Sequence, residues 1–137
     1  MKKGFGLMIT VGMLFGGMLF AQSPQQGSLV KDENKAFFSL EKKLVDFGAI
    51  TIGSSKTIKL SFTNTGKKTL VLTDVYTNCG CTTVDWPKDP FLPGKSGELK
   101  ITYNPTETGP FNKTITVYTN AQNSSEAVQI EGFVAEK

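Results

Sequence analysis

The chain of 137 residues contains no histidine and no arginine, and all four of its methionines lie within the first 18 positions. Without an imidazole, the chain has no group for Ser-His-Asp or Cys-His catalysis near neutral pH. Histidine-ligated zinc and copper sites are excluded for the same reason. Without arginine, the chain lacks a bidentate group for phosphate, and its formal net charge of +3 attracts nucleic acid only weakly. We therefore expect a protein that is not an enzyme and that does not bind nucleic acid.

The first 21 residues have the order of a secretory signal peptide. Lys2 and Lys3 precede an uncharged apolar run over residues 4–20, and Ala21 supplies the small residue at which such peptides are cut. The run is short for a membrane helix and contains five glycines, so we expect cleavage after Ala21 and no stable membrane span afterwards. The product is then periplasmic or secreted, in an oxidising compartment. The polar residues 22–35 indicate a flexible segment.

From residue 36 onward, apolar side chains recur at every second position, which is typical of β-strands. This alternation occupies residues 36–40, 44–47, 57–62, 70–75, 99–103, 114–118 and 128–134. Residues 64–68 predict a hairpin between two of these stretches, and Gly132 predicts a bulge in the last one. The pattern predicts an all-β fold, an immunoglobulin-like antiparallel β-sandwich of about seven to eight strands over residues 36–137. A small closed barrel is the alternative fold.

Several motifs of this body resemble one bacterial family. The segments that carry the likeness are Val45-Asp46-Phe47-Gly48-Ala49-Ile50, Phe62-Thr63-Asn64-Thr65-Gly66, Asn78-Cys79-Gly80-Cys81-Thr82, Pro93-Gly94-Lys95-Ser96-Gly97, residues 109–117 and residues 130–134. In order and spacing they resemble the DUF1573 family of exported domains of unknown function, which is common in Bacteroidetes. The resemblance spans roughly residues 36–134 and implies an ASH/MSP-like immunoglobulin-type sandwich, a fold that mostly serves interaction or structural roles. It implies no activity.

Cys79 and Cys81, the chain's two cysteines, have four interpretations. An internal disulfide needs the backbone to turn at Gly80, because alternate side chains of a strand point to opposite faces. A Cu(I) or Zn site is the second interpretation, since paired thiolates suit soft metals. Its nearby additional ligands are Asp74, Asp85 and Asp89. The third is a pair of thiols open to an external partner, and the fourth is a pair of inert packing residues.

The leading hypothesis is an exported, non-enzymatic module of the cell envelope with an interaction or structural role and an unidentified envelope protein as partner. Its contacts would use an edge strand or residues 79–92, where Trp86, Phe91 and Leu92 are candidate contact residues. A lone tryptophan in a sandwich more often covers the core, which is the alternative for Trp86. The alternative function is a thiol-redox or copper-handling periplasmic protein that uses Cys79 and Cys81.

Overall fold

The computed structural model describes residues 4, 12, 32 and 34–137, and within them the chain forms eight β-strands and no helix. The strands are β1 (Phe38–Leu40), β2 (Leu44–Thr51), β3 (Lys56–Asn64), β4 (Leu72–Thr77), β5 (Thr82–Asp85), β6 (Ser96–Tyr103), β7 (Gly109–Thr119) and β8 (Ser125–Ala135). Apart from residues 4, 12, 32, 34 and 35, the predicted signal peptide and flexible segment lie outside the described residues. No described helix is long and apolar enough to cross a membrane.

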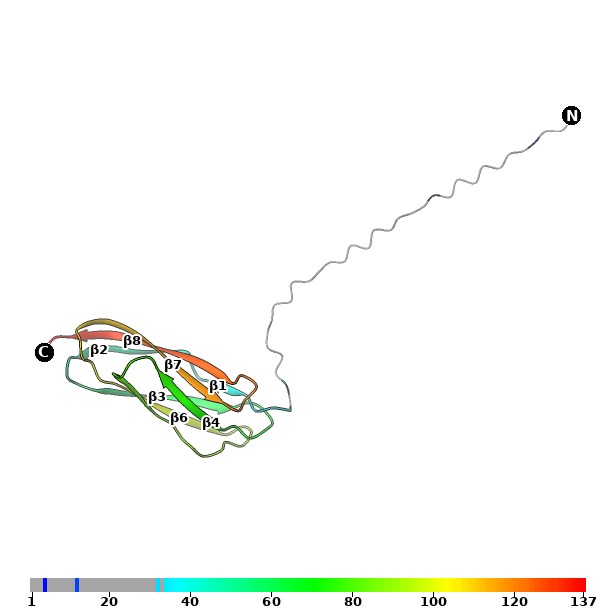
Figure 1. The fold of residues 1–137 in the computed structure, drawn as a ribbon, viewed down its shortest axis with the longest axis horizontal. Coiled ribbons are helices and arrows are strands. Elements are labelled where there is room, and N and C mark those ends of the chain that lie inside the picture. Colours follow the sequence, from blue (N-terminus) through cyan, green and yellow to red (C-terminus); the bar gives the residue numbers. More distant parts are fainter. Residues whose placement is uncertain (1–3, 5–11, 13–31, 33) are drawn as a thin grey trace.

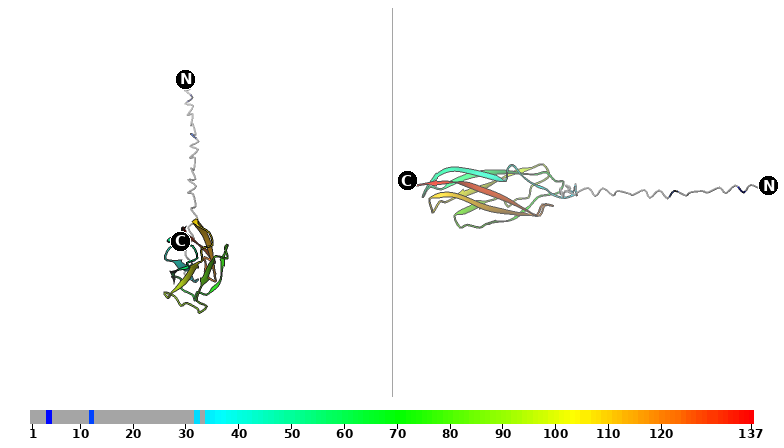
Figure 2. Two further views of the ribbon diagram at one scale, coloured as in Figure 1. Left: turned by 90° about the vertical axis from the view of Figure 1, so that its left-hand side faces the viewer. Right: turned by 90° about the horizontal axis from the view of Figure 1, so that it is seen from above.

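The strands form two stacked four-stranded sheets (Figures 1 and 2). The first has the order β1-β3-β6-β5 and the second the order β2-β8-β7-β4. Every pair is antiparallel except β2 and β8, which run parallel. The chain crosses between the sheets after β1, β2, β3, β4 and β6. The crossings after β1 and after β4 each join edge strands of the two sheets. The predicted immunoglobulin-like β-sandwich is therefore confirmed.

The alternation seen in the sequence decides which side chains enter the core. In β3, Leu60 and Phe62 are buried, whereas Lys59 before them is exposed and Ser61 between them is half-buried. Leu60 faces the buried Leu99 of β6. Burial of each such side chain contributes about 1.5–3 kcal/mol. The inner, apolar faces of the two sheets therefore pack against each other and leave the outer faces in water.

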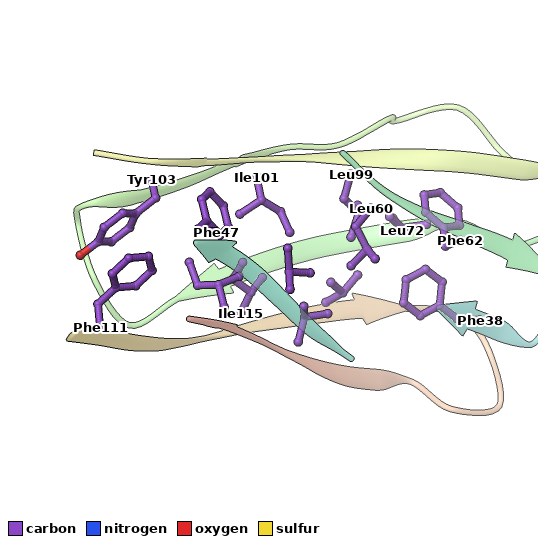
Figure 3. Packing of buried hydrophobic residues seen from close by; sticks show 14 of the residues in the cluster. Phe38, Phe47, Leu60, Phe62, Leu72, Leu99, Ile101, Tyr103, Phe111 and Ile115 are labelled. Atoms are coloured by element: carbon purple, nitrogen blue, oxygen red, sulfur yellow. The ribbon is translucent and has the colours of Figure 1, made fainter. Parts of the chain in front are cut away.

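Aromatic rings close the core at both ends, as Figure 3 shows. At one end the rings of Tyr103 and Phe111 are stacked with their centroids 4.0 Å apart, and Phe47 meets both rings edge-on. At the other end Phe38 packs on Phe62 with a centroid distance of 5.2 Å. Such pairs add about 0.5–1.5 kcal/mol each beyond the area they bury.

The hairpin predicted across residues 64–68 is wrong, because β3 and β4 lie in different sheets. The buried side-chain amide of Asn64 donates to the carbonyl oxygens of Lys68 (2.7 Å) and Phe91 (3.0 Å). Leu70, also buried, exchanges two backbone hydrogen bonds of 2.8 Å with Phe91. These contacts direct the chain across the sandwich to the second sheet instead of folding it back along β3.

The bulge predicted at Gly132 lies on the neighbouring strand instead. The β2–β8 register shifts between Asp46 and Ala49, where Gly48 has a φ of 66°. The β7–β8 ladder continues through Gly132, which faces Phe111. A left-handed φ suits glycine, so the irregularity falls on β2.

Strand β5 was not predicted. Val84 is its single aliphatic residue, and it pairs with Ile101 at the edge of the first sheet. A four-residue edge strand has too few core positions to show an alternation in the sequence.

Candidate functional site

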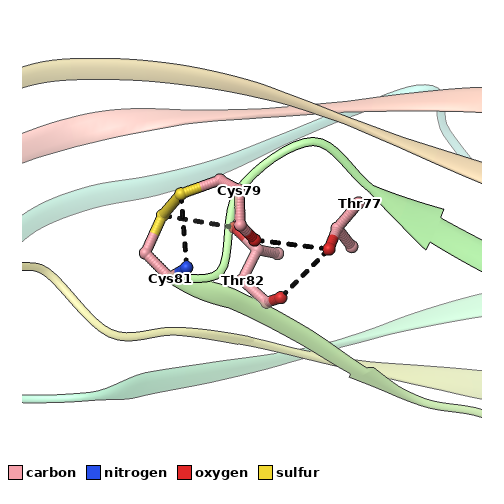
Figure 4. Close-up of a disulfide and its surroundings, with 4 residues drawn as sticks. All are labelled: Thr77, Cys79, Cys81 and Thr82. Carbon is pink, nitrogen blue, oxygen red and sulfur yellow. Dashed lines mark hydrogen bonds between the residues drawn. A yellow bond between two sulfur atoms is a disulfide. The ribbon is translucent and has the colours of Figure 1, made fainter.

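Cys79 and Cys81 are joined by a disulfide with a Cα–Cα distance of 5.2 Å. The bond lies in the turn where the chain crosses from β4, an edge of the second sheet, to β5, an edge of the first (Figure 4). Because the two cysteines are two positions apart, the bond encloses only Gly80. The chain-entropy model gives about 1.5 kcal/mol for a loop this small, against about 3 kcal/mol for a loop of 15 residues. The bond therefore contributes little to the free energy of unfolding.

Hydrogen bonds hold the backbone of this turn independently of the sulfur atoms. The amide of Thr82 donates to the Cys79 carbonyl oxygen (3.2 Å), and the amide of Asn104 donates to the Cys81 carbonyl oxygen (2.8 Å). The Thr77 hydroxyl lies 3.3 Å from the carbonyl oxygens of both Cys79 and Thr82 (Figure 4). The turn geometry thus has backbone support of its own.

Gly80 has no left-handed φ, and a Cβ built there meets nothing within 4 Å. The turn at Gly80 therefore uses no backbone conformation that only glycine adopts readily. An ordinary backbone conformation brings the two sulfur atoms together.

The two sulfur atoms have different surroundings. The backbone amide of Cys81 donates to Cys79 Sγ at 3.2 Å, whereas Cys81 Sγ lies 4.0 Å from the Thr82 hydroxyl (Figure 4). Both cysteines are half-buried, and Cys81 also packs against the hydrophobic core. A hydrogen bond from an amide stabilises negative charge on sulfur, so Cys79 has the better-supported thiolate.

The disulfide forms part of the wall of a polar hollow of about 420 Å³, which Tyr103, Glu107 and Lys113 also line. Burial raises the pKa of Tyr103 above its ordinary value of 10.0, and the negative charge of Glu107 raises it further. The phenol is therefore a neutral hydrogen-bonding group at physiological pH. Lys113 supplies the positive charge of the hollow.

The metal interpretation of Cys79 and Cys81 stays a prediction. Among the residues that the structure describes, no three histidine, cysteine or carboxylate side chains are grouped to hold a metal ion. The sulfur atoms are bonded to each other, so Cu(I) or Zn would require their reduced form.

Trp86, Phe91 and Leu92 do not form one exposed patch. Trp86 is half-buried against the core, and the Lys88 ammonium lies 2.7 Å from the centroid of its ring. Phe91 is half-buried and packs edge-on against Phe62 at a centroid distance of 5.0 Å. Leu92 is exposed. Of these three candidates, only Leu92 offers its side chain fully to a partner.

The outer face of the β2-β8-β7-β4 sheet carries exposed hydrophobic side chains that the sequence pattern alone did not bring together. Of the five large hydrophobic side chains exposed in the described structure, four lie on this face, namely Leu44, Tyr76, Tyr118 and Phe133. The corresponding face of β3 and β6 carries Thr57, Lys59, Ser61, Thr63, Ser96, Glu98, Lys100 and Thr102. Alternation shows that each residue points outward, but the pairing of the strands gathers them on one face.

A shallow groove of about 610 Å³ lies on this outer face, and Phe133 and Pro110 contribute its apolar wall. Asp46 and Glu131 contribute its acidic wall, and they face each other directly on neighbouring strands. The ion pairs of the described residues join Lys43 to Glu126 and Lys59 to Glu98, so neither acid of the groove has a cationic partner there. Like charges opposed across strands destabilise a sheet, and an incoming cation relieves that repulsion.

Comparison with known proteins gives a family and a fold. A family model described as "Protein of unknown function (DUF1573)" matches residues 38–134. No curated protein matches the sequence.

Solved structures with a similar fold come from distant proteins. The ASH/PapD-like domain 7 of human CEP192 superposes with a TM-score of 0.62 at 12% identity, covering 78% of this chain and 91% of that one. A Porphyromonas gingivalis W83 protein of unknown function gives a TM-score of 0.67 at 18% identity, covering 76% of this chain and 50% of that one. A chain of the Acinetobacter baumannii CsuC-CsuE chaperone-tip adhesion subunit pre-assembly complex gives 0.50 at 11% identity, with coverages of 72% and 57%. At these identities the likeness is one of fold.

Proposed function

Because this chain belongs to the DUF1573 family, whose description names no activity, we propose its function from its surface. It is an exported, non-enzymatic interaction module of the cell envelope. It binds a segment of another envelope protein on the outer face of the β2-β8-β7-β4 sheet. The export step is cleavage after Ala21, for which the signal-peptide pattern of residues 1–21 is the support.

The observation that carries the proposal is the difference between the two outer faces. One face gathers four exposed hydrophobic side chains, whereas the other is built from hydroxyl and charged side chains. Contiguous exposed apolar surface marks interaction sites. On this face Phe133 lies opposite Pro110, and Tyr76 and Tyr118 are diagonal neighbours on β4 and β7. The fold supports the same class of function, since one similar structure is a complex of a chaperone with an adhesion subunit.

The groove also defines the chemistry of the partner. Phe133, 52% exposed, supplies an aromatic surface for an apolar side chain. Asp46 and Glu131 supply two negative charges without a cationic partner among the described residues. The segment that fits carries a lysine or arginine beside an apolar residue. The groove is lined by residues of β2, β8 and β7, and β2 is an edge strand of this sheet. An extended segment bound in the groove can therefore also pair with that edge.

The test measures binding of fluorescent peptides that alternate lysine with leucine, against the same peptides with glutamate in place of lysine. We expect the lysine peptides to bind by fluorescence anisotropy and the glutamate peptides not to bind. Phe133→Ser weakens binding about tenfold, as expected for the loss of one buried aromatic contact. Asp46→Asn with Glu131→Gln removes the preference for lysine over glutamate.

Leu92→Ser is the matched control, because Leu92 is the exposed hydrophobic side chain that lies outside this face. A photo-crosslinking amino acid is then placed at position 133 or at position 92 in cells. The position that gives a crosslink to an envelope protein identifies the surface in contact with it. A complex that needs Leu92 and not Phe133 would move the interface to residues 79–92 and overturn the proposal. Equal binding of both peptide sets would overturn the charge assignment.

A further inference from the structure

The Cys79–Cys81 bond has a role that its contribution to folding does not explain. A disulfide that encloses one residue removes little entropy from the unfolded chain. The bond is nevertheless half-buried at the wall of a polar hollow, where a reactant can approach it. We propose that it is a site of thiol–disulfide exchange with a protein dithiol, in which Cys79 forms the mixed disulfide and Cys81 is displaced as the free thiol. This activity is separate from the proposed partner binding and does not depend on it.

The backbone keeps the site assembled in both redox states. The bonds from the Thr82 and Asn104 amides, and those of the Thr77 hydroxyl, involve main-chain oxygen atoms and no sulfur atom. After reduction they still hold the Cα atoms of Cys79 and Cys81 close together. The two thiols therefore stay within reach of each other, and oxidation requires no large rearrangement of the chain.

The environments of the two sulfur atoms assign their roles. Cys79 Sγ accepts the Cys81 amide at 3.2 Å, so the thiolate of the reduced pair is favoured at Cys79. Cys81 packs against the core, where burial disfavours a charged sulfur. Cys79 is thus the nucleophile of the reduced pair, and in the oxidised pair it is the sulfur that an incoming thiolate attacks.

Two charged side chains line the same hollow. The Lys113 ammonium favours a thiolate, and the Glu107 carboxylate opposes one. Glu107 acts electrostatically on the Tyr103 phenol, which places its charge at the tyrosine side of the hollow. Lys113 is therefore the group that we assign to stabilise the anionic sulfur during exchange.

The reaction balances in two steps. A thiolate of the partner dithiol attacks Cys79 Sγ and a new sulfur–sulfur bond forms. The Cys79–Cys81 bond breaks with its electron pair on Cys81 Sγ, which takes up the proton that the attacking thiol had lost. The second thiol of the partner, as a thiolate, then attacks the mixed disulfide and releases Cys79 as a thiolate. The partner is oxidised to a disulfide by two electrons. Cys79 and Cys81 are reduced to thiols, and the two protons given up by the partner dithiol end on them.

The first experiment equilibrates the exported chain with mixtures of reduced and oxidised glutathione at neutral pH. Alkylation and intact mass spectrometry then give the fractions of disulfide and dithiol. We expect comparable amounts of both forms within the range of mixtures, with the fold retained by circular dichroism in each form. A disulfide that stays fully oxidised in a large excess of reduced glutathione would overturn the proposal.

The second experiment separates the roles of the two sulfur atoms. In Cys81→Ser, Cys79 remains alone, and we expect it to react with oxidised glutathione and with iodoacetamide about tenfold faster than Cys81 does in Cys79→Ser. Equal rates, or a faster Cys81, would overturn the assignment.

Lys113→Gln tests the charge of the hollow. We expect Lys113→Gln to slow the reaction of Cys79 severalfold and Lys113→Arg, which keeps the charge, to preserve the rate. The control is Lys42→Gln, a change at an exposed lysine between β1 and β2, and we expect it to leave the rate unchanged. The rate is measured against pH, because loss of a stabilising charge shifts the whole profile toward higher pH. An unchanged profile in Lys113→Gln would remove Lys113 from the site.

Discussion

Gly132 lies opposite Phe111 in the β7–β8 ladder, and the Phe111 ring occupies the space that a side chain at position 132 would need. A Cβ at Gly132 would lie 2.7 Å from two ring carbons and 2.8 Å from the Gly48 carbonyl oxygen. The same ring stacks on Tyr103. The absence of one methyl group therefore lets the aromatic cluster and the β2 bulge occupy the same end of the sandwich.

Gly132→Ala is expected to destabilise the protein by about 1–3 kcal/mol, because overpacking forces the ring or the β2 backbone to move. Urea unfolding followed by tryptophan fluorescence measures the loss. Gly80→Ala is the control, since a Cβ there meets nothing within 4 Å and φ is not left-handed. We expect that control to change stability by less than about 1 kcal/mol. Equal effects of the two substitutions would show that the packing argument for Gly132 is wrong.

Asn64→Ala is expected to cost about 3–5 kcal/mol, since it removes four hydrogen bonds of a fully buried side chain and leaves the buried Gly66 amide unsatisfied. The Asn64 side chain donates to Lys68 and Phe91 and accepts from the amides of Phe37 and Gly66. Thermal unfolding monitored by circular dichroism measures the change.

Asn64→Asp distinguishes hydrogen bonding from lost volume. It keeps the size and the accepting oxygen but places a second oxygen against the carbonyl oxygens of Lys68 and Phe91. We expect it to be strongly destabilising near neutral pH and less so in acid, where the carboxyl group can donate. A near-native Asn64→Asp would show that the cost of Asn64→Ala arises from the cavity alone.

The strands could be predicted from the sequence because each has one face in the core. The period-two pattern located seven of the strands, with boundaries shifted by a few residues. It missed β5, where Val84 alone signals an apolar position. The hairpin at residues 64–68 failed for another reason: a turn signal marks a reversal of the chain but does not say which sheet receives the next strand. Asn64 decides that through bonds to residues distant in sequence.

The candidate sites also depend on contacts between residues that are distant in the sequence. The spacing of Cys79 and Cys81 made an internal disulfide one of four interpretations, and the structure joins them. Lys113 enters the same hollow only because β7 passes beside the β4–β5 crossing. Asp46 and Glu131 lie 85 positions apart and meet through the parallel β2–β8 pair, which local periodicity does not reveal. Contacts between strands therefore build both sites.

Glu126 gives the protein a pH-dependent contribution to stability. Burial alone raises the pKa of this carboxyl, but the ion pair with Lys43 at 2.8 Å and the hydrogen bond from Asn123 at 3.0 Å outweigh burial, so the net shift is downward. Because the folded pKa lies below the ordinary value of 4.5, the contribution is present above that pH and is lost as the pH falls through the folded pKa.

We expect Glu126→Gln to lower the melting temperature at pH 7 and to approach the parent protein near pH 3. The difference at pH 7 corresponds to about 0.5–1 kcal/mol for a partly exposed pair. Glu98→Gln is the comparison, since the Lys59–Glu98 pair is longer, at 3.7 Å, and its carboxylate is 51% exposed. We expect a smaller effect there. A difference between parent and Glu126→Gln that stays constant from pH 7 to pH 3 would contradict the assignment.

Removal of the disulfide tests whether the β4–β5 crossing depends on it. We expect the double variant Cys79→Ala, Cys81→Ala to fold and to lose no more than about 1.5 kcal/mol, because the bond encloses only Gly80. Thr77→Val, which keeps the shape but removes the hydroxyl that bonds the Cys79 and Thr82 carbonyl oxygens, should cost a similar amount or more. Chemical denaturation of both variants and of the reduced parent measures the three losses on one scale.

If the double variant lost more than about 3 kcal/mol, the bond would stabilise the crossing as strongly as the closure of a 15-residue loop, and the turn hydrogen bonds would not suffice to hold the thiols together. If its loss matches that of the reduced parent and stays small, the crossing is held by its backbone, and the redox state of the cysteines can change without unfolding the sandwich.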